Sequence, residues 1–194
     1  MVSKRQKKSS EEKQSVEQMA YRFCGQPSEC DIILEAKTFG CCRYLWNRML
    51  GDHNTLYAEI GEVPNNTPAD YKDLDECSFL KEVDSLALAN VQLNLGRAFD
   101  GFFDGRLRYP KFKAKKYSKL SYTTNAVYGK DGKCNITLDT KAGTLKLPKH
   151  RDLISLNVHR KIRSGGKLKS VTITLEPDGK YYYSILMEYL ICHN

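Results

Sequence analysis

Lysine and arginine alternate with aromatic and small residues in the stretch RLRYPKFKAKKYSK (residues 106–119). Between Gly105 and Lys130 there are eight Lys or Arg residues and no Asp or Glu. Because cations bind phosphates and exposed aromatic rings stack on nucleobases, this pattern predicts a segment that follows a nucleic-acid backbone. Its candidate contacts are Arg106, Arg108, Lys111, Lys113, Lys115, Lys116, Tyr117 and Lys119. The alternative is a solvated surface loop, and for Phe112 it is packing in the core.

A second basic cluster surrounds Gly165-Gly166, and its candidate contacts are Arg160, Lys161, Arg163 and Lys167. A glycine pair among cations is typical of a flexible loop that holds phosphates, although a hairpin tip that only aids solubility has the same composition. Two further candidates, Arg43 and Arg48, are rare cations in an acidic region. They face nucleic acid or form ion pairs with Glu35 or Asp52.

The sequence predicts neither a catalytic residue, a metal site nor a cofactor. Its four histidines form no His-x-His pair, and its seven cysteines form no Cys-x-x-Cys pair. The adjacent Cys41 and Cys42 lie in a helical pattern, which indicates reduced thiols and a cytoplasmic protein. No stretch approaches the ~20 apolar residues of a membrane span, so we expect no membrane contact.

The net charge of +8 is divided sharply along the chain. Residues 1–26 carry a charge of +3, residues 27–104 carry −8, and residues 105–194 carry +13. A chain with this division is expected to bind a polyanion with its C-terminal part and not with its central part.

Helical signals occupy the acidic region. Ser28, with Asp31 three residues later, predicts a capping box, and apolar residues at helical spacing follow: Ile32, Ala36, Phe39, Cys42, Trp46 and Met49. This helix is expected to continue to Gly61. Thr67-Pro68 predicts a second, short helix, and a third is expected from about Asp84 to Asp104.

Alternating strand patterns occupy the basic region and also residues 18–26. The clearest is a hairpin formed by Val171–Leu175, the turn Glu176–Gly179 and the strand Lys180–Met187. Because residues 18–26 have no neighbouring strand pattern, we expect them to pair with a C-terminal strand. The predicted fold is therefore α+β: a small split β-barrel, closed to hide its edges and interrupted by an inserted helical bundle.

Four segments in the same order resemble the N-terminal half of the TnpB proteins, the OrfB accessory proteins of insertion sequences, which are related to type V CRISPR RNA-guided nucleases. They are TFGCCRYLWNRML (38–50), FLKEVDSLALANVQLNLGRAFDGFF (79–103), YPKFKAKK (109–116) and SVTITLEPDGKYYYSILME (170–188). The resemblance implies an OB-like wedge barrel that holds a guide RNA. It also implies an inserted recognition domain, described as a transposase helix-turn-helix region, that helps the wedge to read a short motif beside the DNA target.

This resemblance gives the expected domains. They are a disordered basic tail (1–17), the first barrel strand (18–26), the helical recognition domain (27–104), the rest of the wedge (105–188) and a tail (189–194). In the family a Gly-Ile-Asp motif with the first nuclease aspartate follows the strand that matches residues 181–188. Here Tyr189–Asn194 follow instead, so we expect the RuvC-like domain to be absent and the chain to have no catalysis of its own.

Three functions are compatible with these observations. The first is a fragment of an RNA-guided nuclease that binds guide RNA and DNA, the second is a stand-alone helix-turn-helix DNA-binding regulator, and the third is the binding half of a nuclease whose other half is separately encoded. A helix-turn-helix reader needs cations on its recognition helix, so the acidic helical region favours the first. The sequence leaves the oligomeric state, the RNA and the DNA motif open.

Overall fold

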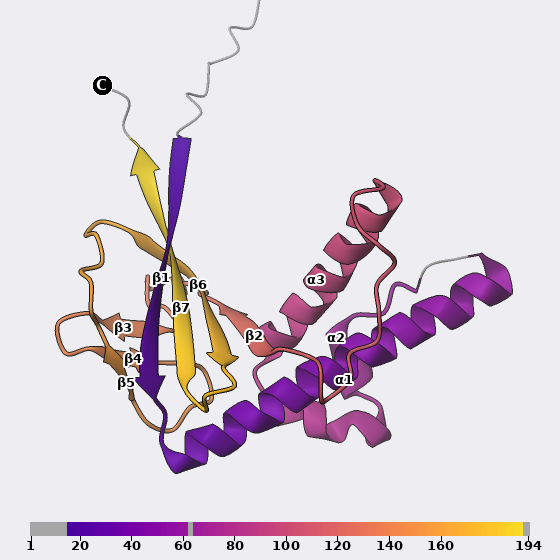
Figure 1. Ribbon diagram of the computed structural model, residues 1–194, viewed down its shortest axis with the longest axis horizontal. Helices are drawn as coiled ribbons and strands as arrows, with labels where there is room; N and C mark the ends of the chain where they lie inside the picture. Colours follow the sequence, from indigo (N-terminus) through magenta and orange to yellow (C-terminus); the bar gives the residue numbers. More distant parts are fainter. Residues whose placement is uncertain (1–14, 62–63, 192–194) are drawn as a thin grey trace, which may run out of the picture.

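A computed structural model describes residues 15–61 and 64–191, with four helices beside one curled antiparallel sheet (Figure 1). The predicted α+β class is confirmed. The sheet has the order β2-β6-β7-β1-β5-β4-β3. Its strands are β1 (Ser15–Gln26), β2 (Leu120–Asn125), β3 (Thr137–Asp139), β4 (Thr144–Lys146), β5 (Ile154–Asn157), β6 (Lys167–Leu175) and β7 (Tyr181–Ile191).

The first strand lies in the middle of the sheet, between β7 and β5. Met19 lies opposite Met187 and Phe23 opposite Tyr183, which confirms that this early strand pairs with the C-terminal half. Both strands are longer than predicted because their pairing continues to Ser15 opposite Ile191. Residues 15–17 and 189–191 are therefore strand rather than tail. The rest of both predicted tails, 1–14 and 192–194, lies outside the described residues.

The predicted closure of the barrel is wrong for the part of the chain that the structure describes, because β2 and β3 are unpaired with each other and form two edges. The chain between them folds back on itself in a small hairpin, with a bridge between Tyr128 and Cys134. Gly129 N–H donates to the carbonyl of Lys133 at 2.8 Å within this hairpin. The result is a half-barrel with one open side.

All four helices lie between β1 and β2 in the chain. They are α1 (Glu29–Ile60), α2 (Pro68–Lys72), the 3-10 helix η1 (Asp75–Lys81) and α3 (Ser85–Phe103). The Ser28 hydroxyl accepts a hydrogen bond from Asp31 N–H at 3.3 Å, and Gly61 ends α1 in the left-handed conformation with φ 72°. None of these helices is both long and apolar enough to cross a membrane.

The helices pack on the β2 side of the sheet. Phe39 of α1 contacts Tyr122 of β2, with ring centroids 5.5 Å apart. Asn90 of α3 donates to the carbonyl of Thr123 at 3.0 Å, so both long helices contact the same edge strand. Trp46 is buried, as predicted, and belongs to the core that the helices share with the sheet.

The predicted apolar face of α1 is wrong at its N-terminal end. Ile32 and Ala36 are exposed, whereas Asp31 and Glu35 are buried. The helix is rotated so that its two carboxylates face the C-terminal half of the chain, where both accept hydrogen bonds.

Candidate nucleic-acid interface

The basic segment (residues 105–119) has no regular secondary structure and runs from the end of α3 past α1 to β2 (Figure 1). Two side chains of α1 hold its backbone. Trp46 Nε1 donates to the carbonyl of Lys111 at 3.0 Å. Asn47 accepts from Lys113 N–H at 2.7 Å and donates to the Lys113 carbonyl at 2.9 Å. Because these bonds use backbone groups, the lysine side chains stay available to solvent.

Every predicted contact residue of this segment is exposed. Tyr117 is 82% exposed and Phe112 is 59% exposed, so Phe112 does not pack in the core. Its ring lies 4.0 Å from where a Cβ of Gly51 in α1 would be, which places it on the helix surface. Both rings are therefore accessible for stacking.

The cations of the basic segment differ in their neighbours. Arg106 forms an ion pair with Asp104, Lys113 Nζ lies 3.8 Å from the centroid of the Trp46 ring, and Lys116 Nζ lies 5.5 Å from that of Tyr117. Within the described residues, the other four have no carboxylate partner: Arg108, Lys111, Lys115 and Lys119. These four are the least neutralised charges of the segment.

The second cluster lies around the loop between β5 and β6. Each of its predicted cations except Lys161 lies over the ring of a tyrosine. Arg160 lies 4.6 Å from the ring centroid of Tyr21 and donates to the carbonyl of Ala20 at 2.6 Å. Lys167 lies 4.7 Å from the Tyr128 ring. Stacking on a ring leaves a guanidinium with donors for a phosphate.

The loop itself is anchored to the sheet through Arg163. The Tyr189 hydroxyl donates to the Arg163 carbonyl at 3.0 Å, and Arg163 N–H donates to the Tyr21 hydroxyl at 3.2 Å. The guanidinium lies 4.9 Å from the Tyr189 ring and pairs with Glu17 at 2.8 Å. These contacts hold the loop against the sheet, which argues against the predicted flexibility of the loop.

The two candidate arginines of α1 are the weakest of the set. Arg48 pairs with Asp52 and with Glu76, each at 3.4 Å, which confirms the alternative interpretation for this residue. Arg43 is half-buried and forms no ion pair with a described residue. Neither arginine forms an ion pair with Glu35, whose carboxylate contacts His150 and Tyr183 instead.

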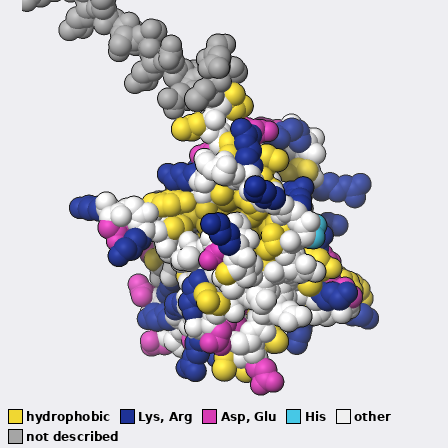
Figure 2. Space-filling model, turned by 90° about the vertical axis from the view of Figure 1, so that its left-hand side faces the viewer, with side chains coloured by type: hydrophobic (Ala, Val, Ile, Leu, Met, Phe, Trp, Pro, Cys, Tyr) yellow, Lys and Arg dark blue, Asp and Glu magenta, His cyan; other side chains and the backbone are white. Residues whose placement is uncertain are grey.

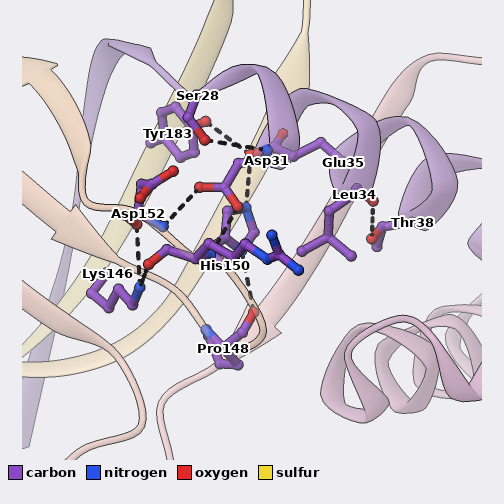
Figure 3. Close-up of polar contacts among 11 residues, drawn as sticks. Ser28, Asp31, Leu34, Glu35, Thr38, Lys146, Pro148, His150, Asp152 and Tyr183 are labelled. Carbon is purple, nitrogen blue, oxygen red and sulfur yellow. Dashed lines mark hydrogen bonds and ion pairs between the residues drawn. The ribbon is translucent and has the colours of Figure 1, made fainter.

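A buried polar cluster joins the helix that holds the basic segment to the sheet that carries the second cluster (Figure 3). Glu35 Oε1 accepts from His150 Nε2 at 3.2 Å and from the Tyr183 hydroxyl at 2.9 Å. The carboxylate of Asp31 accepts from the backbone N–H of Arg151 at 2.9 Å and of Asp152 at 3.2 Å. All of these carboxylate contacts join α1 to residues from the C-terminal half of the chain.

The protonation of His150 follows from its partners. Its ring nitrogens face the Glu35 carboxylate and, at 3.2 Å, the carbonyl of Pro148, and both groups only accept hydrogen bonds. Burial alone would lower the pKa of His150, but these bonds and the charges of Glu35 and Asp31 outweigh it and raise that pKa. Burial and the Glu35 charge raise the pKa of Tyr183, so its hydroxyl stays a donor.

The sequence reasoning missed both sets of supporting residues. Asn47 gave no pattern signal, because one polar residue on an exposed helix face is ordinary. The cluster had a signal: Asp31 and Glu35 are four residues apart and thus share one helix face. Among residues 15–61 and 64–191, no group of three or more His, Cys, Asp or Glu side chains is arranged to hold a metal ion.

Comparison with known proteins finds a matching domain family in the N-terminal part of the chain. A family profile described as "Helix-turn-helix domain", of the OrfB type, matches residues 19–62. These residues form most of β1 and all of α1, which is a single uninterrupted helix.

Two similar proteins carry names that state an activity. A "Putative RNA-guided DNA endonuclease" of Streptomyces pristinaespiralis is 27% identical over 176 residues, which are 87% of this chain and 41% of that protein. The "Putative RNA-guided DNA endonuclease InsQ" of Escherichia coli (strain K12) is 28% identical over 178 residues, 87% of this chain and 40% of that protein. The chain thus spans about two fifths of these relatives, and the predicted resemblance to the N-terminal half of TnpB/OrfB-type insertion-sequence proteins is confirmed.

Proposed function

We propose that this chain is the nucleic-acid-binding part of a TnpB-type RNA-guided DNA endonuclease, that it holds guide RNA and helps to contact target DNA, and that it does not cleave DNA by itself. The observation that carries this proposal is the separation of charge between its two structural parts. Residues 105–194 have a charge of +13, and the four helices lie within a region of charge −8. A polyanion is attracted to the first part and repelled by the second.

In this proposal the half-barrel is the family's OB-like wedge domain, made of β1 and residues from 105 onward, and residues 27–104 are the inserted recognition domain. Guide RNA follows the basic segment and reaches the cations of the β5–β6 loop. The junction of Asp31, Glu35 and His150 supports this arrangement, because it holds the two basic surfaces in a fixed relation. Target DNA approaches the helices only where RNA or Arg43 offsets their negative charge.

A stand-alone helix-turn-helix regulator is the second candidate, and the family profile favours it by name. The charges of α1 argue against it. Lys37 pairs with Glu82 at 2.5 Å and Arg48 pairs with two carboxylates, so the helix offers few free cations to a DNA groove. In the third candidate a separately encoded nuclease half binds this chain, and a reading frame for that half beside this gene would support it.

The test compares two charge variants. In the first, Lys111, Lys113, Lys115 and Lys116 are changed to Glu, and in the second, Arg43 and Arg48 are changed to Glu. RNA affinity is measured over a salt series, where each lost phosphate contact with single-stranded RNA reduces the slope of log affinity against log salt by about 0.7. We expect the lysine variant to lose most of its affinity and much of its slope, and the arginine variant to keep both.

The opposite pattern would show that the helices bind the RNA and would overturn the assignment. A third variant, with the same four Lys→Glu changes, which lower the net charge by eight, and eight lysines added before Ser15, restores the net charge at another place. If that variant binds as tightly as the original chain, the lysines contribute only a diffuse field.

A further inference from the structure

A cavity of about 810 Å³ lies between the hairpin that precedes β3 and the loop between β5 and β6. Its volume is within the range of pockets that bind small organic ligands, about 300–1,000 Å³. The apolar side chains that line it come from the segment before β3, from β3, β6 and β7, and from the loop: Ile136, Leu138, Val158, Ile162, Leu168 and Met187. Such a surface accepts a flat, weakly polar group.

Basic side chains around the cavity give its lining a positive charge. Lys133, Lys141, Lys161 and Arg163 line it, and no Asp or Glu does. Figure 2 looks at the side of the molecule formed by β3, β4 and β5 and shows apolar side chains in the middle of this face, with Lys and Arg beside them. An apolar hollow among cations is complementary to a nucleotide, whose base is flat and whose phosphates are negative. Arg163 pairs with Glu17 and Lys133 with Asp131, outside the lining, whereas Lys141 and Lys161 have no carboxylate partner among the described residues. An uncharged protein segment that filled the apolar hollow would leave Lys141 and Lys161 unpaired.

One aromatic side chain in the cavity is held in place. Tyr128 is 37% exposed, and its hydroxyl donates to the carbonyl of Leu168 at 3.1 Å. Across the cavity, Gly166 lies so close to Tyr189 that a Cβ on it would be 2.5 Å from that ring. Because glycine allows this approach, the loop lies against the sheet and the hollow stays open.

We propose that this cavity binds one nucleobase, unstacked from a single-stranded part of the bound RNA, with Tyr128 stacking on the base and the surrounding cations contacting the adjacent phosphates. This inference rests on the proposed RNA binding and deepens it. RNA is the expected partner because its loops and bulges present single bases, whereas the bases of duplex DNA are stacked and paired.

The test uses oligouridine of about ten nucleotides, within the size range that single OB-type modules cover. Tyr128→Ala is expected to weaken its binding roughly 5- to 150-fold, as removal of one stacked base does at about 1–3 kcal/mol. Tyr128→Phe keeps the ring but loses the hydrogen bond to the Leu168 carbonyl, so it is expected to bind more tightly than Tyr128→Ala and less tightly than the original chain. On an abasic ribose-phosphate of the same length, all three proteins are expected to bind equally.

A second measurement does not depend on a substitution. Cys134 is half-buried and lines the cavity, whereas Cys30 is exposed and lies outside it. Oligouridine is expected to slow the alkylation of Cys134 and to leave that of Cys30 unchanged, and oligodeoxyuridine serves as the comparison for sugar preference.

Two results would overturn the inference in different ways. If oligouridine binds, but equally to the original chain and to Tyr128→Ala, and without protection of Cys134, the cavity has another occupant and RNA binding itself stands. If neither oligouridine nor any longer RNA binds, the proposed function is wrong and the inference falls with it.

Discussion

At the scale of single residues, the contact between His150 and Glu35 has the clearest chemical consequence. Both side chains are almost fully buried, with exposed fractions of 3% and 0%. Glu35 Oε2 has no hydrogen-bond partner among the described residues, so the carboxylate depends on the two donors at Oε1. Removal of one partner from such a pair leaves a charge that nothing compensates.

This contact predicts a pH dependence of stability. The pKa of His150 is raised in the folded protein, so its contribution is fully present below pH 6.5, the ordinary value, and is lost as the pH rises through the folded-state pKa. His150→Gln is expected to lower the free energy of unfolding by about 3–5 kcal/mol at pH 6, with a smaller difference at pH 9. Urea unfolding at several pH values measures this difference, and parallel curves for the two proteins would contradict it.

His53 provides a control of opposite sign. Burial lowers its pKa, so its neutral form is favoured in the folded protein and stability is lost as the pH falls through the folded-state pKa. The original chain is expected to lose stability as the pH falls below 6.5, because His53 must then be protonated. His53→Gln is expected to lose less stability over the same pH range. The two substitutions therefore change the slope of the free energy of unfolding against pH in opposite directions.

At the scale of elements, α1 determines where the basic segment lies. Asn47 forms two hydrogen bonds with the backbone of Lys113, and each such bond is worth about 0.5–1.5 kcal/mol. Asn47→Ala is expected to release the segment and to increase tryptic cleavage at Lys111–Lys116 by roughly 5- to 150-fold. RNA affinity should fall as well, although every cation remains.

Thr55→Ala is the matched control, because the Thr55 hydroxyl donates to the carbonyl of Gly51 within the same helix at 3.1 Å. Its cleavage rate and RNA affinity should equal those of the original chain. If Asn47→Ala is cleaved no faster than this control, the segment is held by Trp46 or by its own conformation.

Element types and their order could be predicted from the sequence because the signals are local. Ser28 and Gly61 mark the ends of α1, and the alternation in residues 171–187 marks the final hairpin. The pairing of β1 was also predictable, since a single strand pattern before a helical region requires a distant partner. The open side of the barrel is not predictable from the sequence. It depends on the hairpin at Tyr128, which lies between β2 and β3 and leaves these two strands unpaired with each other.

The candidate site could be predicted only in part, for the same physical reason. A run of lysines is visible in a sequence, whereas the residues that position it are visible only after folding. Helical spacing predicts that Trp46 lies in the core, but it does not predict the hydrogen bond to the Lys111 carbonyl, 65 residues away in the chain. The prediction for the buried face of α1 is wrong because hydrophobicity does not reveal that His150 and Tyr183 donate hydrogen bonds to a buried carboxylate.

At the scale of the whole molecule, β1 makes the sheet dependent on both ends of the chain. It pairs with β7 from Ser15 to Gly25 and with β5 at its C-terminal end, and the helices follow it directly in the chain. Movement of α1 is therefore transmitted to a central strand of the sheet rather than to an edge. Under the proposed function, this connection would link RNA bound on the sheet to DNA that approaches the helices.

The same view of the whole chain predicts its behaviour toward DNA in the presence of magnesium. Cleavage of a phosphodiester by two metal ions needs carboxylates around ions about 4 Å apart. Among the described residues no such group of ligands is found, and Glu17, Glu176 and Glu188 of the half-barrel pair with cations instead. We expect the purified chain, with or without RNA, to leave supercoiled and single-stranded DNA intact in the presence of Mg²⁺.

The variant with glutamates at Lys111, Lys113, Lys115 and Lys116 is the control for this measurement. A contaminating nuclease would act equally in preparations of both proteins, because it does not depend on the basic segment. Cleavage by the original chain that is lost in this variant would instead belong to the chain itself. It would show that residues 1–194 assemble a catalytic site, and the division of binding and cleavage proposed above would be wrong.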